Sequence, residues 1–189
     1  MRLNRLAIPD VVEIVPTRHG DQRGYFSETF RSDWFAHNIA DLAFVQENQS
    51  LSRSKGVLRG LHFQTRPSAQ GKLVRCLAGA VMDVAVDIRQ GSPTFGAHVA
   101  VTLTADEGNQ LWIPEGFLHG FCTLTPDVIL SYKVTAYYDP AADRGVAWND
   151  PDLAIAWPDF VDPGLLSAKD QQLPRLRDTP PYFDYKDSI

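Results

Sequence analysis

Apolar and polar residues alternate along most of this chain. In VMDVAVDI, residues 81–88, every second position is apolar and Asp83 and Asp87 fall on the opposite face. In HVAVTLTA, residues 98–105, valine and leucine alternate with histidine and threonine. A period of two is typical of β-strands with one apolar and one polar face. The pattern therefore predicts half-buried strands, with the two aspartates away from the apolar side.

Further segments of the same character are separated by turn-forming residues. They cover residues 11–18, 24–30, 43–52, 57–64, 72–79, 110–114, 119–125 and 128–138. Between them, glycine, proline, aspartate and asparagine gather in stretches such as HGDQRG and DPAADRG, where the chain can reverse. Many short strands joined in this way predict an all-β fold, a sandwich or barrel of antiparallel strands.

One helix is expected over residues 31–41, where Ser32 can cap the first turn and large apolar side chains can share a face. From about residue 150 the pattern is irregular, although residues 167–176 are expected to contain a helical turn or two. No repeat or linker separates a second domain. Residues 1–189 are therefore expected to form one domain, with the last part packed on the barrel.

The composition is that of a globular protein, with 44% hydrophobic and 22% charged residues. No apolar run approaches the roughly 20 residues that cross a bilayer, and the N-terminus lacks a signal-peptide pattern, so we expect no membrane association and a cytoplasmic location. A net charge of −5 argues against nucleic-acid binding. Cys76 and Cys122 lie in apolar segments and are expected to be buried free thiols.

Positive charge is distributed unevenly. Between Glu47 and Asp83 there is no acidic residue. The same segment contains six cationic residues, namely Arg53, Lys55, Arg59, Arg66, Lys72 and Arg75. Each one alone is most simply a solvated surface group. Together, around His62, they predict a local pocket for a compact anion such as a phosphate or a diphosphate.

Several common catalytic motifs are absent, including GxGxxG after a strand, GxxxxGK[ST], GxSxG and HExxH. A metal is a more serious possibility, because β-barrels often hold one with two histidines a single residue apart. Here Gln64 follows two residues after His62, and none of the five histidines forms such a pair. We therefore expect no metal and no cofactor.

His62 lies in a strand where its ring is expected to point away from Leu61 and Phe63. An imidazole, with an ordinary pKa of about 6.5, suits proton abstraction near neutral pH. Periodicity alone favours a structural histidine and leaves a proton-transfer base as the alternative. Tyr132 offers a phenol and Asp170 a carboxylate, but their spacing from His62 assigns neither of them a role.

Several longer blocks follow one another along residues 8–172. They are GDQRGYFSETF, FVQENQS, GVLRGLHFQ, AQGKLVRCLAGAVMDVAVDIRQGSPTFG, QLWIPEGFLHGF, YKVTAYYDP, WNDPDLAIAWP and LSAKD. In these blocks the chain resembles the dTDP-4-dehydrorhamnose 3,5-epimerase family of nucleotide-sugar enzymes. The resemblance implies a cupin-type jelly roll without a metal, working as a homodimer. It also implies a dTDP-linked 4-keto-6-deoxyhexose as substrate, inverted at C3 and C5 on the route to dTDP-L-rhamnose.

The resemblance also implies roles for four residues. Both C3 and C5 flank the C4 ketone, so removal of either proton gives an enolate, and reprotonation from the opposite face inverts the carbon. By resemblance, His62 is the base and Asp170 the carboxylate that orients it. Tyr132 is the proton donor on the other face, and Lys72 is the cation near the C4 oxygen.

By the same resemblance, the substrate-binding residues are Arg23, Glu28, Gln46, Glu47, Asn48, Arg59, Lys72, His119, Asp143 and Lys169. Aromatic side chains are expected to hold the thymine. The N-terminal strand of the family exchanges between subunits, so Arg23 and Glu28 are expected to serve the neighbour's site. Two positions depart from the family pattern: Glu47 replaces the usual aspartate, and Ser131 stands where an apolar residue is common.

Three alternatives remain open. An epimerase that acts at one carbon only would arise if small changes in the pocket prevented the ring flip between the two steps. A barrel that binds a nucleotide sugar without catalysis belongs to another class of protein. A metal-dependent cupin oxygenase is the third alternative, and bound iron would be its signature.

Overall fold

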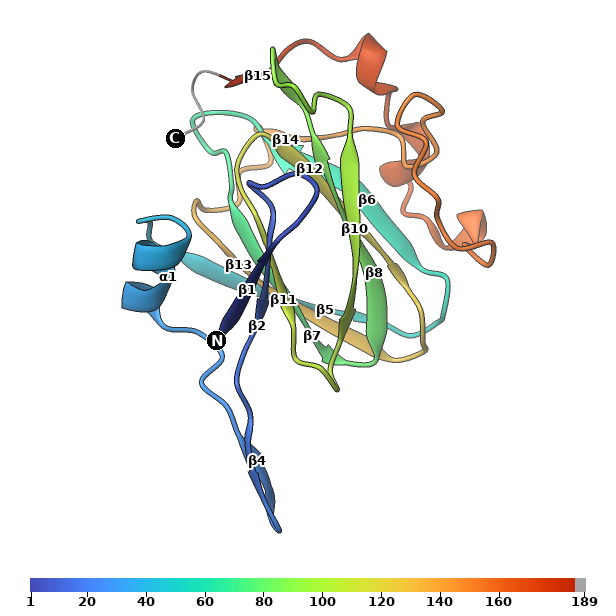
Figure 1. Cartoon of the computed structure of the whole chain (residues 1–189). Helices are drawn as coiled ribbons and strands as arrows, with labels where there is room; N and C mark the ends of the chain where they lie inside the picture. Colours follow the sequence, from blue (N-terminus) through green and yellow to red (C-terminus); the bar gives the residue numbers. More distant parts are fainter. Residues whose placement is uncertain (186–189) are drawn as a thin grey trace.

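Two antiparallel β-sheets pack face to face in the computed structural model, which describes residues 1–185 (Figure 1). The larger sheet has the order β1-β2-β11-β7-β13-β5. Its strands are β1 (Arg2–Arg5), β2 (Val12–Val15), β5 (Gln46–Ser52), β7 (Lys72–Ala78), β11 (Gln110–Ile113) and β13 (Val128–Val134). The second sheet has the order β10-β8-β12-β6-β14. Its strands are β6 (Leu58–Gln64), β8 (Ala80–Asp87), β10 (His98–Thr104), β12 (Phe117–Thr123) and β14 (Asp143–Gly145).

The remaining elements are short. Two further strand pairs are β3 (His19–Asp21) with β4 (Gly24–Phe26), and β9 (Arg89–Gln90) with β15 (Phe183–Asp184). One α-helix, α1 (Ser32–Asn38), follows the β3–β4 hairpin. The C-terminal part contains three 3-10 turns, η1 (Pro163–Leu165), η2 (Asp170–Gln172) and η3 (Leu176–Asp178). This arrangement confirms the predicted all-β fold of antiparallel strands.

Apolar side chains of the two sheets meet between them and form the main core. The larger sheet contributes Val74, Leu111, Ile113 and Leu130, and the second sheet contributes Val81, Ala85, Val99, Leu103, Phe117 and Phe121. All of these side chains are less than a tenth exposed. Burial of this apolar surface is the dominant favourable contribution to folding.

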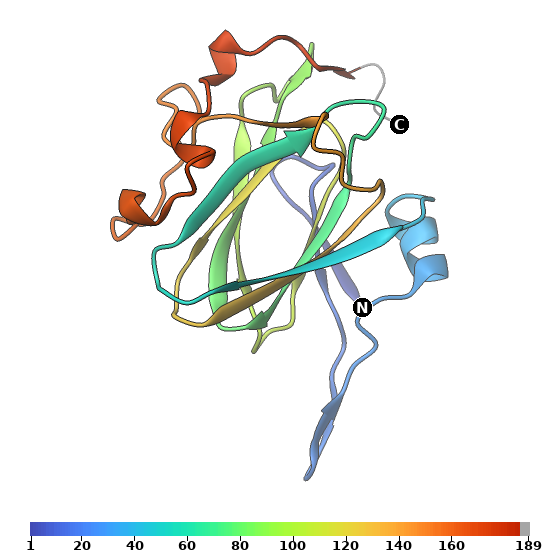
Figure 2. The ribbon, with the colours of Figure 1, turned by 180° about the vertical axis from the view of Figure 1, so that it is seen from behind.

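Both faces of β8 are buried, which corrects the prediction of a polar outer face. The side with Val84 and Val86 packs under the C-terminal segment, residues 146–185, which runs along the outside of the second sheet (Figure 2). The other side points between the sheets, and both Asp83 and Asp87 on it are 0% exposed. The alternation was predicted correctly, but it does not tell which face another segment covers.

Helix α1 covers the outer face of the larger sheet. Phe35 is 2% exposed, and its ring packs edge-on against Trp112 with 5.2 Å between the centroids. The predicted cap is wrong, because the helix begins at Ser32 and the capping position is Arg31, which makes no side-chain capping bond. The helix also ends at Asn38, three residues before the predicted end.

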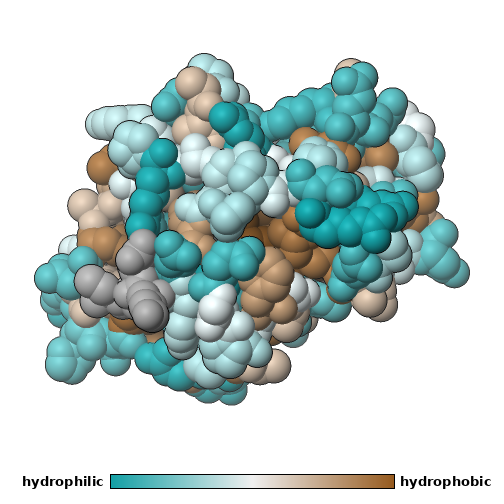
Figure 3. Space-filling model, turned by 90° about the horizontal axis from the view of Figure 1, so that it is seen from above, coloured by the Kyte–Doolittle hydropathy of each residue, from teal (hydrophilic) through white to brown (hydrophobic). Residues whose placement is uncertain are grey.

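The β3–β4 hairpin projects from the body of the molecule (Figure 1). All of its strand residues are exposed, and the exposed fractions of Tyr25 and Phe26 reach 60% and 72%. Large aromatic side chains on a projecting arm are characteristic of a contact with another molecule. The rest of the surface is mixed: seen from above, apolar side chains lie recessed among polar ones (Figure 3).

Cys76 and Cys122 are buried free thiols, as predicted. Burial raises the pKa of both, that of Cys122 to about 11, so neither thiol is a nucleophile near neutral pH. Among residues 1–185, no helix has the length and hydrophobicity that crossing a bilayer requires.

Candidate active site

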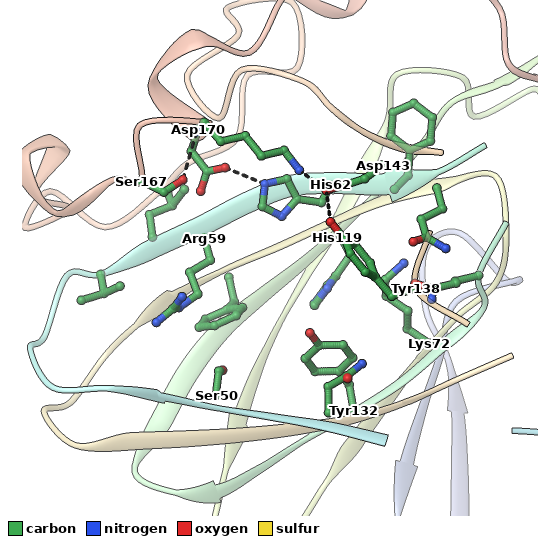
Figure 4. A pocket seen from close by; sticks show the side chains of 18 of the residues that line it. Ser50, Arg59, His62, Lys72, His119, Tyr132, Tyr138, Asp143, Ser167 and Asp170 are labelled. Carbon is green, nitrogen blue, oxygen red and sulfur yellow. Dashed lines mark hydrogen bonds and ion pairs between the residues drawn. The ribbon is translucent and has the colours of Figure 1, made fainter. Parts of the chain in front are cut away.

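A cavity of about 600 Å³ lies between the two sheets (Figure 4). Strands β5, β7 and β13 of the larger sheet line it, together with β6, β12 and β14 of the second sheet. Residues 165–170 of the C-terminal segment complete the wall. A concave space of this size with converging polar groups is typical of a small-molecule site.

His62 and Asp170 form a hydrogen-bonded pair at one wall of this cavity. The ring Nε2 of His62 lies 2.6 Å from Oδ1 of Asp170. Burial would raise the pKa of Asp170, but the hydrogen bond and charge of His62 outweigh it and hold that pKa below its usual value. The second ring nitrogen of His62 points into the cavity (Figure 4). An ionised carboxylate thus fixes an imidazole whose free nitrogen is in position to take a proton.

Strand β6 explains the orientation of His62. Leu61 and Phe63 belong to the apolar cluster under the C-terminal segment, and the residue between them must point to the other side of the sheet. Asp170 reaches it from the start of η2, where Ser167 Oγ accepts the Asp170 backbone N–H at 3.1 Å. The ring direction therefore agrees with the prediction from alternation.

Tyr132 lies across the cavity from His62 (Figure 4). It is on β13, directly opposite Asn48 of β5. Burial raises the pKa of its phenol, and the charge of Asp143 raises it further against the opposing effect of Arg59. The phenol therefore keeps its proton near neutral pH and can donate it.

Lys72 is the first residue of β7 and is 7% exposed. Burial lowers the pKa of its ammonium group to about 8, and the negative charge of Asp143 only partly opposes this shift. The ammonium group has no hydrogen bond or ion pair with any residue of the described chain. Its proton donors are consequently free to stabilise negative charge on a bound molecule.

Asp143, Lys169 and Tyr138 form a polar group at the edge of the cavity. Lys169 Nζ lies 2.5 Å from Asp143 Oδ2, and the Tyr138 hydroxyl donates to the same oxygen at 3.2 Å. The ion pair joins β14 to the C-terminal segment beside Asp170. Tyr138 is 57% exposed, so its aromatic ring is accessible at the cavity.

Arg59 and His119 come from neighbouring strands of the second sheet. Arg59 donates to Ser52 Oγ and to the Leu51 carbonyl oxygen, both at 3.3 Å. A guanidinium has five N–H donors, so further ones remain for an anion. His119 Nε2 lies 3.0 Å from Asp83 Oδ2.

The structure brings most of the predicted site residues together. Those that line the cavity are Gln46, Asn48, Arg59, His62, Lys72, His119, Tyr132, Asp143, Lys169 and Asp170. Because they line one cavity, they can act on one bound molecule. Their individual roles stay predictions.

Glu47 was predicted to bind the substrate, but it does not line the cavity. Gln46 and Asn48, its neighbours on β5, face inward and are hydrogen-bonded to each other at 2.7 Å. Glu47 points to the other side of the sheet, where it accepts hydrogen bonds from Ser131 Oγ and Lys133 Nζ, both at 2.7 Å. Three consecutive residues of a strand cannot share one face, because side chains alternate.

Arg23 and Glu28 are also absent from the cavity of their own chain. Arg23 is at the turn of the β3–β4 hairpin, 83% of its side chain is exposed, and it pairs with Asp21 at 2.5 Å. Within one chain, the hairpin projects away from the body that contains the cavity (Figure 1). The expectation that these two residues serve a second copy thus stays a prediction.

The predicted cluster of six cations is only partly realised. Arg59 and Lys72 line the cavity. The other four lie elsewhere: Arg53 pairs with Asp127, Arg66 pairs with Glu115, Lys55 lies over the ring of Phe160, and Arg75 donates to Thr29. The six cations are close in sequence but not in space, because turns separate them and successive side chains of a strand point to opposite faces.

Several lining residues were not predicted. They include Ser50, Gln64, Gln70, Phe121, Tyr138 and Ser167. Alternation on β5 would have found Ser50 beside Gln46 and Asn48. Phe121 and Tyr138 belong to a group of aromatic residues that comes late in the series of strands, but the sequence alone favours a place in the core for such residues. In the part of the chain that the structure describes, no three His, Cys, Asp or Glu side chains are arranged to hold a metal.

Comparison with known proteins gives one consistent family. Residues 5–178 match the family model described as dTDP-4-dehydrorhamnose 3,5-epimerase. An enzyme of that name from Sinorhizobium fredii is 52% identical over 185 residues, which cover 98% of this chain and 94% of the relative. A dTDP-4-dehydrorhamnose 3-epimerase from Streptomyces niveus is 42% identical over 172 residues, which cover 90% of this chain and 82% of the relative.

A solved structure agrees over nearly the whole fold. The 3,5-epimerase from Legionella pneumophila, crystallised in complex with dTDP-4-keto-L-rhamnose, superposes with a TM-score of 0.92 at 42% identity and covers 97% of this chain and 98% of its own. This likeness confirms the predicted cupin-type jelly roll. From its sequence and its fold, the chain belongs to the dTDP-4-dehydrorhamnose 3,5-epimerase family of isomerases.

Proposed function

We propose that this protein epimerises dTDP-4-dehydro-6-deoxy-D-glucose at C3 and C5 to give dTDP-4-dehydro-L-rhamnose. The observation that carries the proposal is the placement of His62, with Asp170 behind it, across one cavity from Tyr132. A base and an acid on opposite sides of a substrate are the groups that inversion of a carbon requires. We expect the reaction to take place in the cytoplasm as a step toward dTDP-L-rhamnose.

The free nitrogen of His62 takes the proton from C3 or C5, both of which are acidified by the C4 ketone. The electron pair moves into the ketone, and the negative charge collects on the C4 oxygen. Lys72, buried and without a protein partner in residues 1–185, donates to this oxygen. The Tyr132 phenol then protonates the carbon from the opposite face. While His62 carries the abstracted proton, the carboxylate of Asp170 stabilises the resulting imidazolium.

The nucleotide is held by groups around the same cavity. Arg59 is suited to the diphosphate, since its planar fork can give two parallel hydrogen bonds to phosphate oxygens. Tyr138 offers an accessible aromatic face on which the thymine stacks. Gln46 and Asn48 supply amide groups from the opposite sheet.

The active form is a homodimer in this proposal. The projecting β3–β4 hairpin, with Tyr25 and Phe26 exposed, inserts into a second copy and carries Arg23 and Glu28 to its site. A cationic side chain delivered in this way would add to Arg59 on the diphosphate.

Incubation with dTDP-4-keto-6-deoxyglucose in D₂O tests the function directly. Proton NMR should show deuterium at both C3 and C5 and formation of the L-rhamno product. Tyr132→Phe should still exchange deuterium through His62 but form far less inverted product. Tyr137→Phe, an exposed phenol outside the cavity, is the matched control and should behave like the unchanged protein.

The same experiment separates the second candidate, an epimerase that acts at one carbon. The relative from Streptomyces niveus, named a 3-epimerase, supports it because monoepimerases share this family. Deuterium at C3 alone would identify that activity. Tight binding of the substrate without any exchange would instead identify a non-catalytic binding protein and refute both epimerase proposals.

A further inference from the structure

His119 has a buried carboxylate partner of its own. Its Nε2 lies 3.0 Å from Oδ2 and 3.1 Å from Oδ1 of Asp83. Asp83 belongs to β8, the strand next to β12, and its side chain is 0% exposed. Within residues 1–185, His119 is the only hydrogen-bond or ion-pair partner of Asp83.

The surroundings of Asp83 make its buried carboxylate unfavourable for the stability of the fold. It shares a face of β8 with Val81 and Ala85, which belong to the apolar core between the sheets. Burial of a carboxylate costs free energy that a single partner offsets only in part. An apolar side chain at such a place would serve stability at least as well. Stability therefore does not account for Asp83, and its hydrogen bond to His119, which lines the cavity, is the contact that remains to explain it.

The hydrogen bond to Asp83 fixes the tautomer and the orientation of the His119 ring. A carboxylate only accepts, so Nε2 is the nitrogen that carries the proton toward Asp83. Nδ1 has no partner among the described residues, and the ring lines the cavity (Figure 4). Phe121 lies beside the ring, with 6.3 Å between the centroids and 32° between the ring planes.

The register of the strands places His119 next to His62, the proposed base. It is directly opposite His62 on the neighbouring strand β6. A molecule bound in front of His62 therefore also lies next to the His119 ring.

We propose that Asp83 is a positioning residue, which holds His119 with Nδ1 directed at the sugar of the substrate and affects turnover only through that ring. The proposal rests on the proposed epimerase function. A ring held in one orientation offers its hydrogen bond without first losing rotational freedom, and misplacement of such a group by about 1 Å lowers rates about 100-fold.

A double-mutant cycle tests the proposal, with kcat/KM measured for the wild type, Asp83→Asn, His119→Ala and the double variant. Asp83→Asn should lower kcat/KM about 10- to 100-fold in the wild-type background, because an amide can turn either its oxygen or its NH2 group to the ring and no longer fixes which ring nitrogen carries the proton. In the His119→Ala background it should change kcat/KM less than about twofold, because the ring on which it acts is gone. Equal losses in the two backgrounds would overturn the proposal.

Two further measurements distinguish positioning from a structural role. The Kd of dTDP, measured by calorimetry, should stay within about threefold in Asp83→Asn, since dTDP lacks the hexose at which the proposal directs His119. The thermal midpoint should change little, because removal of the buried charge and burial of the Asn amide group have opposite effects on stability. A parallel loss of dTDP affinity would contradict the proposal.

Thr123→Val is the matched control for a buried polar residue of the same sheet. Thr123 is 0% exposed on β12, and its hydroxyl accepts from the Val57 backbone N–H and donates to the Ser54 carbonyl oxygen. Its replacement should lower the thermal midpoint and leave kcat/KM unchanged. Asp83→Ala provides a second test if the asparagine variant fails to fold. An inactive wild type would refute the epimerase function itself, which is a different outcome from an additive cycle.

Discussion

His62 on β6 and His119 on β12 are cross-strand partners, and each ring hydrogen-bonds through Nε2 to a buried aspartate. The two carboxylates come from different places. Asp83 is supplied by the adjacent strand, whereas Asp170 is supplied by the C-terminal segment. One sheet thus presents two oriented imidazoles to one cavity, and only the His62 pair depends on the docking of residues 146–185.

Replacement of Asp170 tests its action on His62. Asp170→Asn keeps the shape of the side chain but removes the charge that stabilises the imidazolium, so kcat should fall about 100- to 10,000-fold. Steady-state kinetics measures the loss, and calorimetry with dTDP should show unchanged binding. Asp162→Asn, an exposed cap of η1 in the same segment, is the control and should leave kcat unaffected. Similar kcat values for the two variants would contradict the assignment.

Lys72 should make stability depend on pH in a defined direction. Its pKa is about 8 in the folded chain and 10.5 ordinarily, so between these values the unfolded chain binds more protons. The free energy of unfolding should therefore rise with pH across this window, by up to about 3 kcal/mol from this group. Urea denaturation at pH 7 and pH 10 measures the rise, which Lys72→Met should lack. The exposed Lys55→Met is the control, and a rise that persists in Lys72→Met would refute the assignment.

Neighbouring residues of β5 should differ sharply in their effect on the substrate. Asn48→Ala removes an amide that faces the cavity, and KM should rise by about a factor of ten, equivalent to one hydrogen bond of about 1.4 kcal/mol. Glu47→Gln alters a contact to Ser131 and Lys133 on the other face, so kcat and KM should stay within about twofold of the wild type. A large rise in KM for Glu47→Gln would restore its predicted role in binding.

Mixed dimers can test whether the hairpin completes a neighbour's site. Arg23→Ala and His62→Asn should each be nearly inactive when pure. After the two are mixed and allowed to exchange subunits, some dimers contain one site with neither substitution, because Arg23 and His62 of one site come from different chains. Recovery of up to about a quarter of the wild-type activity is expected. No recovery, despite exchange confirmed by mass spectrometry, would show that each chain builds its site alone.

The sequence by itself determined the class of fold and the direction of key side chains. Alternation with a period of two predicted the strands, and it turned His62 away from Leu61 and Phe63, as the structure confirms. Applied to residues 46–48, the same rule would have separated Glu47 from its neighbours, although the prediction from the family resemblance placed all three in the site. These features are local, because they follow from backbone geometry within a single strand.

Only the tertiary structure decided which faces are covered and which distant groups meet. The sequence predicted that Asp83 lies on a polar face of its strand. In the structure the C-terminal segment covers the opposite face of β8, and the face with Asp83 is buried between the two sheets. Asp170 meets His62 across 108 positions of sequence because that same segment folds back over the second sheet. Such contacts depend on packing between elements rather than on the preferences of any one element, so no local pattern in the sequence encodes them.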